Sequence, residues 1–202
     1  MKLKTLLPKS EVRKFVVKRR KETIPDDVHS KTKLILDKLK TVDEFDYAKK
    51  IHSYVSNKAG EVDTRYLIDF MVNNGKSVVL PKLNKKAKKF QRANFSGWDN
   101  LVKNTDGYYE PSIATDEDLS DIDLIIVPAM AVSVVGQRVG YGGGFYDRLL
   151  KQTNAAKIVL AFEFQVFDDI ETELHDIRID KVITERRIIN TRVGFDKDSE
   201  LL

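Results

Sequence analysis

The run Leu124–Val127 is the feature that most constrains the fold, because four consecutive apolar residues are followed at once by Pro128. A short continuous apolar run of this kind is typical of a strand buried on both faces, and such strands belong to parallel sheets. Parallel neighbours need long crossover connections, which are usually helices. The rest of the chain is therefore expected to supply helices between strands.

Helical and strand patterns do alternate along the sequence. We expect helices at Lys9–Lys21, Val28–Leu39, Thr64–Asn73 and Phe145–Lys151, and further strands at Tyr47–Val55, Ser77–Leu80, Lys157–Ala161 and Lys181–Thr184. Asn74-Gly75 predicts the end of one helix, and Pro81 predicts the end of one strand. The pattern predicts an α/β fold with a three-layer α/β/α arrangement, in which helices cover both faces of a mostly parallel, Rossmann-like sheet. No repeat or linker is evident, so we expect a single domain over residues 1–202.

Composition narrows the class of protein further. Hydrophobic residues make up 42% of the chain, enough for a sizeable core, and the absence of cysteine excludes disulfides, thiolate zinc sites and cysteine nucleophiles. No apolar run approaches the roughly 20 residues that span a bilayer. The apolar stretch near Met1 is shorter than the roughly 7 to 15 residues of a signal peptide. We expect a cytoplasmic protein without a membrane partner.

Charge is unevenly distributed along the chain. Residues 1–40 carry 13 basic and 5 acidic groups, and residues 81–92 carry 6 basic and no acidic groups. Residues 93–202 carry 11 basic and 20 acidic groups. The two basic segments favour an anionic ligand, although each taken alone is equally well interpreted as a solvated charged face.

The segment 136–148 concentrates the candidate chemistry, since it holds half of the chain's 10 glycines between a strand and a helix. Glycines allow backbone N–H groups to approach phosphate oxygens, and a helix N-terminus favours the same anion. Arg138 and Arg148 add positive charge, and Asp147 offers an oxygen ligand for Mg²⁺. The segment matches neither the phosphate-binding loop nor the dinucleotide fingerprint. The alternative is a tight turn, which rarely needs three consecutive glycines.

Gly140-Tyr-Gly-Gly-Gly-Phe-Tyr-Asp147, preceded by Arg138, resembles the signature of the 5-formyltetrahydrofolate cyclo-ligase (5,10-methenyltetrahydrofolate synthetase) family. Further elements resemble the same family in order and spacing: Lys9-Ser-Glu-Val-Arg13, Glu61-Val-Asp-Thr64, Tyr109-Glu110-Pro111, Phe164-Gln165, His175-Asp176 and Ile183-Thr184-Glu185. Two departures affect the expected substrate pocket. Pro128-Ala129 stands where many members have Pro-Gly, and Ser133 lies where an Asp is common.

The resemblance implies an ATP- and Mg²⁺-dependent ligase that converts 5-formyltetrahydrofolate to 5,10-methenyltetrahydrofolate, ADP and phosphate. It implies that the formyl oxygen is phosphorylated before the neighbouring folate nitrogen closes the ring. Such chemistry needs positioning and charge neutralisation rather than a protein nucleophile. The folate could be polyglutamylated, and the lysines near residues 85–89 could contact its tail. We expect a monomer.

The resemblance also implies residue roles. It implies ATP binding by Lys9, Arg13, Arg138, Gly140, Tyr141, Gly142, Gly143, Gly144, Phe145 and Tyr146. Arg138, Tyr146 and Asp147 are expected to be catalytic, Asp147 and Asp176 to bind Mg²⁺, and Glu61 and Tyr108 to contact the folate.

Each of these residues has a structural alternative when it is considered alone. Lys9 and Arg13, four apart, would form an exposed basic helix face. Glu61 would be an exposed acid near a helix start that Asp63 caps better. Tyr108 would be a tyrosine that packs in the core or at its rim, and Asp176 would be a solvated surface acid. For Trp98 we expect a packing role.

Two other functions remain open at this point. One is a nucleotide- or folate-binding relative without ligase activity. The other is a nucleic-acid-binding protein that uses Lys82–Arg92 and the first helix, although this segment has a single aromatic residue and no RNA-binding signature.

Overall fold

The computed structural model describes residues 7–57, 60–87, 89–116, 119–173 and 176–191. The helices are α1 (Lys9–Glu22), α2 (Pro25–Leu39), α3 (Asp43–Asp46), α4 (Thr64–Asn73) and α5 (Phe145–Leu150). The strands are β1 (Lys50–His52), β2 (Ser77–Asn84), β3 (Lys89–Asn94), β4 (Leu101–Lys103), β5 (Tyr109–Pro111), β6 (Thr115–Asp116), β7 (Leu124–Ile126), β8 (Ala131–Ser133), β9 (Arg138–Val139), β10 (Ala156–Leu160), β11 (Val166–Phe167), β12 (Lys181–Ile183) and β13 (Ile188–Asn190).

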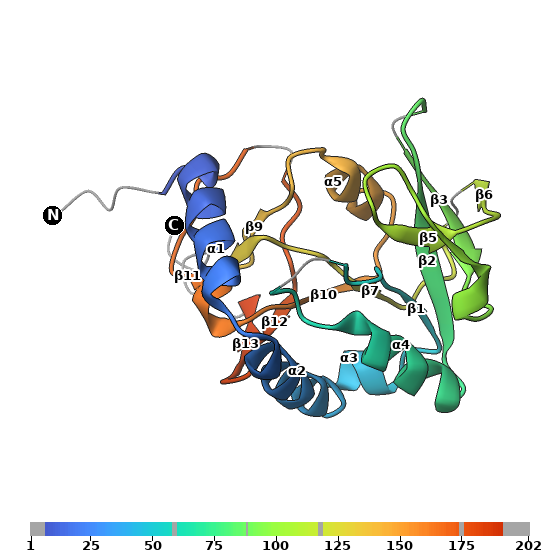
Figure 1. Cartoon of the computed structure of the whole chain (residues 1–202), viewed down its shortest axis with the longest axis horizontal. Helices are drawn as coiled ribbons and strands as arrows, with labels where there is room; N and C mark the ends of the chain where they lie inside the picture. The colour runs from blue at the N-terminus through green and yellow to red at the C-terminus, as the bar shows by residue number, and fades with distance from the viewer. Residues whose placement is uncertain (1–6, 58–59, 88, 117–118, 174–175, 192–202) are drawn as a thin grey trace, which may run out of the picture.

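An eight-stranded sheet in the order β13-β12-β10-β7-β1-β2-β3-β6 forms the centre of the molecule (Figure 1). Its five middle strands, β12 to β2, run parallel, and the three outer strands are antiparallel to their neighbours. The predicted α/β class with a mostly parallel sheet is confirmed. β7, the strand predicted from the apolar run, lies between β10 and β1 in the middle of the sheet.

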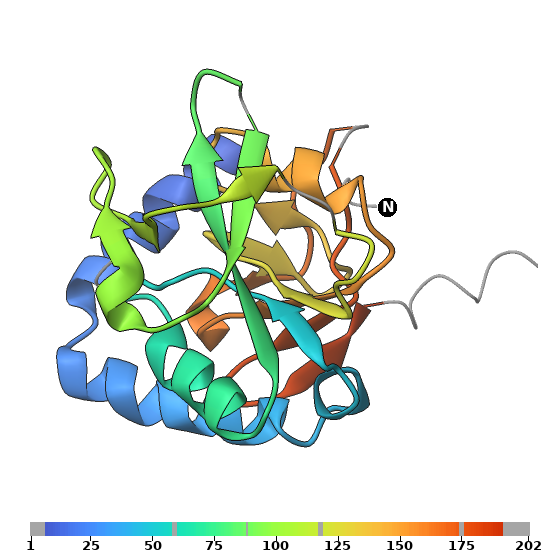
Figure 2. The same cartoon turned by 90° about the vertical axis from the view of Figure 1, so that its right-hand side faces the viewer.

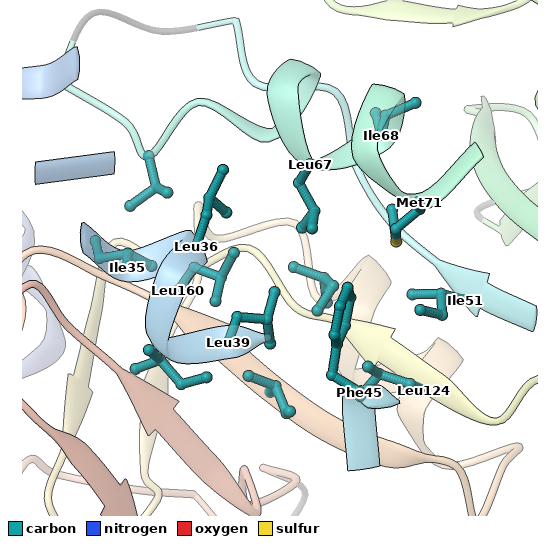
Figure 3. Close-up of a cluster of buried hydrophobic side chains, with 14 of the residues drawn as sticks. Ile35, Leu36, Leu39, Phe45, Ile51, Leu67, Ile68, Met71, Leu124 and Leu160 are labelled. Atoms are coloured by element: carbon teal, nitrogen blue, oxygen red, sulfur yellow. The ribbon is translucent and has the colours of Figure 1, made fainter. Parts of the chain in front are cut away.

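Helices cover both faces of this sheet, as the residue alternation requires. On β7, Leu124 and Ile126 belong to one core cluster, and Ile125 belongs to the other. The first cluster lies under α2, α3 and α4 (Figure 3), and the second lies under α5. Successive strand residues point to opposite faces, so a middle strand is buried on both sides. Most residues of these strands are apolar, and His52 on β1 and Lys157 on β10 are buried polar exceptions.

Helix α1 packs elsewhere, on a small sheet in the order β11-β8-β9 (Figure 1). Val12 and Val16 are buried there against Ala131 and Val139. Phe15, although it shares their helical spacing, is half exposed and contacts the ring edge of Phe167. The opposite face of α1 remains available to carry charged side chains.

The predicted strand Tyr47–Val55 is wrong in its extent. Tyr47 is 78% exposed and follows α3, a helix that the sequence pattern did not predict. The carboxylate of Asp123 accepts hydrogen bonds from the backbone N–H groups of Lys49 and Lys50, both at 2.8 Å. These bonds fix the start of β1 at Lys50, three residues after the predicted start at Tyr47.

The prediction that Pro81 ends its strand is also wrong, because β2 continues to Asn84 and pairs with β3 as a hairpin (Figure 2). β1 ends at His52, opposite Val79, so the later part of β2 has a sheet neighbour on one side only. On the side of β2 where β1 has ended, the Leu83 N–H donates to the Glu110 side chain instead of to a neighbouring strand. The nitrogen of Pro81, two residues earlier, points to this same side. Because no strand lies there, the missing N–H of proline costs no hydrogen bond of the sheet.

The remaining predictions hold with small shifts at the ends of elements. Helix α4 begins and ends where the sequence predicted, with Asp63 accepting from the Arg65 N–H at its start. Within the part of the chain that the structure describes, no helix is long and apolar enough to cross a bilayer.

Candidate functional site

A cavity of about 500 Å³ opens beyond the carboxyl ends of β1 and β7 and beside the later part of β2. This is the edge of a parallel sheet where ligands bind in open α/β folds. Segments far apart in the sequence meet there: the start of α1, the loop after β1, the β2–β3 hairpin and the turn before α5 (Figures 1 and 2). The cavity is lined by every predicted site residue: Lys9, Arg13, Glu61, Tyr108, Arg138, Gly140, Tyr141, Gly142, Gly143, Gly144, Phe145, Tyr146, Asp147 and Asp176.

At one end of the cavity, Lys9 is held between two carboxylates. Its Nζ lies 2.6 Å from Asp176 and 3.1 Å from Glu173. Partial burial alone would lower the pKa of Lys9, but the hydrogen bonds to these two acids outweigh it and raise the pKa above the usual value. Lys9 is therefore a positive charge at neutral pH, and its side chain is only 16% exposed. The alternative interpretation of Lys9, as part of an exposed basic helix face, is therefore wrong.

Arg13 and Arg138 approach the glycine segment from two sides. The Arg13 Nε donates to the carbonyl oxygen of Gly140 at 2.9 Å, and Arg138 donates to Asp147 at 2.6 Å. A Cβ atom on Gly140 would lie 2.8 Å from Arg138 Nη1. Glycine at this position therefore leaves room for the guanidinium, and the two cations and the backbone form one continuous lining.

The turn before α5 accounts for part of the glycine run. Gly142 and Gly144 have φ of +101° and +62°, a region that glycine favours. Gly143 has no such conformation, yet a Cβ atom there would lie 2.7 Å from the Phe145 ring. The alternative of a tight turn thus explains two of the three consecutive glycines, and close packing against Phe145 explains the third.

Asp147, Asp176 and Glu173 each form an ion pair in the cavity. Among residues 7–191 that the structure describes, no three Asp, Glu or His side chains form a group able to hold a metal ion. Asp147 and Asp176 still offer two carboxylates in a cavity that also holds Lys9, Arg13 and Arg138. Mg²⁺ is usually held by one or two carboxylates together with substrate phosphates, so this donor set fits a magnesium–nucleotide complex.

The other end of the cavity is largely aromatic. Tyr54, Phe90 and Tyr108 line it, together with Pro81 and Leu83. The ring of Phe90 meets those of Phe145 and Tyr146 at centroid distances of 5.6 and 5.2 Å. An apolar slot of this kind suits a flat heteroaromatic ring.

Glu61 brings a carboxylate to this aromatic end. It is 8% exposed, so the interpretation as an exposed acid is wrong. It accepts hydrogen bonds from Arg20 at 3.3 Å and from the Tyr141 hydroxyl. Burial and the nearby Glu61 charge raise the pKa values of Tyr54 and Tyr141. Both phenols are therefore neutral donors at physiological pH.

Sequence reasoning missed Arg20 and Glu173. Arg20 follows Arg13 by seven residues and Lys9 by eleven, so about 20° around the helix axis separates it from each. This spacing was a usable signal. Glu173 offered none, because its role depends on the loop that brings it to Lys9.

Two further aromatic and titratable groups lie away from the cavity lining. Trp98 donates to Asp69 at 2.8 Å and packs against the ring of Phe95, which confirms a packing role. His29 is exposed and contacts Tyr66. His175 lies outside the described residues.

Comparison with known proteins gives consistent results. The model of the 5-formyltetrahydrofolate cyclo-ligase family matches residues 7–185. A probable 5-formyltetrahydrofolate cyclo-ligase of Caenorhabditis elegans is 27% identical over 195 residues, covering 90% of this chain and 94% of the relative. The 5-formyltetrahydrofolate cyclo-ligase of Escherichia coli K12 is 33% identical over 135 residues, or 64% of this chain and 74% of the relative.

A solved structure agrees with these relatives. The 5,10-methenyltetrahydrofolate synthetase of Aquifex aeolicus superposes with a TM-score of 0.80 at 30% identity, covering 91% of this chain and 93% of that chain. The match of the family model extends over most of the chain and includes the cavity lining described above. The expectation of a ligase is thereby confirmed at the level of the family, and the chain belongs to the 5-formyltetrahydrofolate cyclo-ligase family.

Proposed function

We propose that this chain uses ATP and Mg²⁺ to convert 5-formyltetrahydrofolate to 5,10-methenyltetrahydrofolate, with release of ADP and phosphate. One observation carries the proposal: a single cavity is lined by cations and a glycine segment, and also by aromatic rings and the Glu61 carboxylate. The cations and the glycine segment suit a polyphosphate, and the rings with Glu61 suit a pterin. A reaction between ATP and a folate requires both in one place.

The phosphates of ATP would lie against Lys9, Arg13 and Arg138, with backbone N–H groups of the segment Gly140–Tyr146 completing the contact. Charge-assisted hydrogen bonds from Lys and Arg are about twice as strong as neutral ones, which suits a highly charged ligand. Lys9 already carries its full charge, and phosphate oxygens would compete with Asp176 and Glu173 for it.

Asp147 and Asp176 would hold Mg²⁺, which neutralises charge on the phosphates when it is bound. The Asp147 carboxylate now accepts from Arg138, so the same Arg can turn to the phosphate when Asp147 takes a cation. Tyr146 packs edge to face against Phe90 and would orient the transferred group from the aromatic side.

The pterin would enter the aromatic end beside Tyr108, with its N–H groups donating to Glu61. The Glu61 carboxylate is held by Arg20 and Tyr141, so its orientation is set before the substrate arrives. A preorganised acceptor of this kind loses little freedom on binding.

The proposed reaction needs no covalent intermediate with the protein. The formyl oxygen attacks the γ-phosphorus of ATP, the bond to the bridging oxygen breaks, and ADP leaves. The neighbouring folate nitrogen then attacks the formyl carbon and loses its proton, and phosphate departs with the former formyl oxygen. Arg138 and Lys9 would stabilise the charge that develops on the transferred group, which is the main form of catalysis in such reactions.

A variant of Lys9 tests the nucleotide end. Lys9→Ala should raise the KM for ATP roughly tenfold or more, because a charge-assisted contact is lost, while the KM for the folate changes little. Lys14→Ala, an exposed lysine on the same helix, is the matched control. Steady-state rates at varied ATP give both constants. An unchanged KM in Lys9→Ala would remove Lys9 from the ATP site.

Ligand binding, ADP formation and a gel-shift experiment separate the alternative functions. A binding protein without ligase activity would bind both ligands and form no ADP when folate is added. A nucleic-acid-binding protein would retard DNA or RNA in a gel at low salt, with affinity that falls steeply as salt rises.

We also propose that the β2–β3 hairpin contacts a polyglutamate tail. Lys85 pairs with Asp106 at 2.7 Å, and Asp106 lines the cavity, so the hairpin tip lies at its mouth. Neutralising Lys85, Lys86, Lys88 and Lys89 should raise the KM of a polyglutamyl substrate and leave that of the monoglutamate unchanged. Lys88 lies outside the described residues. Equal changes for both substrates would contradict this contact.

A further inference from the structure

Arg20 is a buried cation that contacts Glu61 and Tyr141, two neighbouring residues of the cavity lining. It lies in the last turn of α1 and is 8% exposed. Its Nη1 donates to Glu61 at 3.3 Å and to the Tyr141 hydroxyl at 2.9 Å, and its Nη2 donates to the carbonyl oxygen of Ala129 at 3.2 Å. Tyr141 in turn donates to Glu61. The three side chains form a closed triangle of hydrogen bonds.

The three corners of this triangle belong to three different parts of the site. Glu61 lies in the loop after β1, at the aromatic end. Tyr141 belongs to the glycine segment, directly after Gly140, whose carbonyl oxygen accepts from Arg13. Arg20 lies on the same side of α1 as Lys9, about 16 Å further along the helix axis. One rigid helix therefore reaches both the expected phosphate site and the Glu61 carboxylate.

A buried carboxylate is stable only with compensating partners, and a planar guanidinium can serve two acceptors at once. Glu61 consequently cannot move without disturbing Arg20 or Tyr141. The Tyr141 hydroxyl can reach Glu61 and Arg20 only from this course of the backbone between Gly140 and Gly142. A ligand that orders this backbone therefore favours the arrangement in which Glu61 is held.

We propose that Arg20 is a positioning residue that couples nucleotide binding to folate binding through Tyr141 and Glu61. The inference rests on the proposed function, since it takes the glycine segment as the nucleotide site and Glu61 as the folate site. ATP phosphates order Gly140–Gly144, Tyr141 holds its hydroxyl on Glu61, and the folate meets a carboxylate already in place. Nucleotide and folate then bind with positive cooperativity.

Calorimetric titration of the whole chain measures this coupling directly. The dissociation constant of 5-formyltetrahydrofolate is measured with and without a non-hydrolysable ATP analogue and Mg²⁺. In the wild type the analogue should lower this constant by roughly fivefold or more, within the usual range of coupling between two sites. By thermodynamic linkage, the folate should tighten binding of the analogue by the same factor.

Two variants remove the connection in different ways. Tyr141→Phe deletes one hydroxyl from a side chain that is 40% exposed, so the fold should be retained. Arg20→Met deletes the charge but keeps most of the stem. Both should bring the coupling factor close to one, and Arg20→Lys should recover only part of it, because an ammonium cannot reproduce the planar fork. Arg19→Met and Tyr47→Phe, both exposed and away from the cavity, should retain the wild-type factor.

The outcomes are distinct. Tyr141→Phe with the full wild-type coupling factor would overturn the inference even if Arg20→Met fails to fold. A wild type that turns over substrate while its two ligands bind independently would overturn the inference and leave the proposed function intact. A wild type that binds neither ligand would overturn both.

Discussion

Arg138 and Asp147 form an ion pair in the cavity, and removing the charge of Asp147 leaves the buried Arg138 without this partner. Arg138 is 4% exposed at its side chain, and Asp147 is its closest acidic neighbour. Neutralising Asp147 therefore has two consequences: a ligand for Mg²⁺ is lost, and Arg138 loses its counter-charge. An isosteric replacement keeps the shape and isolates the effect of charge.

Asp147→Asn should lower kcat by roughly two orders of magnitude or more, comparable to the loss of one preorganised electrostatic contact in other enzymes. Asp147→Ala should abolish turnover. Asp168→Asn, an exposed acid outside the cavity, is the control and should keep the wild-type rate. Initial rates at saturating ATP and folate give the comparison. Wild-type turnover in Asp147→Asn would contradict the assignment of the metal site.

His52 makes stability sensitive to acid. It is completely buried beside the ring of Tyr146, and burial, assisted by the charge of Arg92, lowers its pKa to about 3. The unfolded chain protonates this histidine near pH 6.5, whereas the folded chain does not. Below pH 6.5 the unfolded state therefore binds more protons, and stability falls as the pH drops toward 3.

Between pH 7 and pH 5 this histidine should cost the folded state about 2 kcal/mol, from about 1.4 kcal/mol for each pH unit below 6.5. His52→Leu should remove that part of the pH dependence, whereas His29→Leu at an exposed histidine should not. Urea unfolding at the two pH values measures the difference. Equal pH dependence in wild type and His52→Leu would contradict the burial argument.

At this scale the resemblance to the family, carried by short motifs, named residues that the structure brings into one cavity. The pairings escaped prediction. The structural alternative for Glu61 was an exposed acid. The sequence around Glu61 gives no sign of its ion pair with Arg20, which is 41 residues away. Ion pairs between distant elements depend on the fold, and a linear pattern does not encode them.

Among the elements, α4 is the one that local signals define most completely. Beyond Asn73 the Gly75 N–H donates to Val72 and the Lys76 N–H donates to Met71, the two bonds of a Schellman motif. Gly75 has φ of +74°, and no heavy atom lies within 4 Å of the position of a Cβ there. Backbone strain alone therefore sets the cost of a substitution.

Gly75→Ala should destabilise the chain by about 1 kcal/mol, the cost of the left-handed conformation less the entropy that alanine removes from the unfolded state. Gly75→Asn should cost less, because asparagine tolerates this conformation better. Thermal or urea unfolding of the two variants tests the order. A larger loss in Gly75→Asn than in Gly75→Ala would contradict a purely conformational origin.

Elements without such local signals were missed or misjudged. β2 extends past Pro81 because its neighbour β1 has already ended, a fact of sheet topology that no local rule contains. The helix α3 and the antiparallel strands β6 and β13 were not predicted, and the strand predicted from Tyr47 begins only at Lys50. Continuous apolar runs identify middle strands well, whereas edge strands depend on what lies beside them.

On the scale of the whole molecule, the parallel strands bring distant segments to one edge of the sheet. Lys9 and Asp176 are 167 residues apart in the sequence, yet the Lys9 Nζ lies 2.6 Å from Asp176 Oδ2. Lys9 begins α1 and Asp176 lies between β11 and β12, so both reach the cavity from outside the large sheet. The segments after β1 and β7 reach the same cavity because the carboxyl ends of parallel strands share an edge. These segments together form the cavity. The proposed reaction requires that ATP and the folate occupy it at the same time.

The most direct test is an absorbance assay in the near ultraviolet with purified protein, 5-formyltetrahydrofolate, ATP and Mg²⁺. We predict that methenyltetrahydrofolate appears, and that omitting either ATP or Mg²⁺ abolishes its formation. Absence of product while ATP binding is still detectable would contradict the proposed function. It would direct attention to Ala129 and Ser133, where the sequence departs from the pattern of the family.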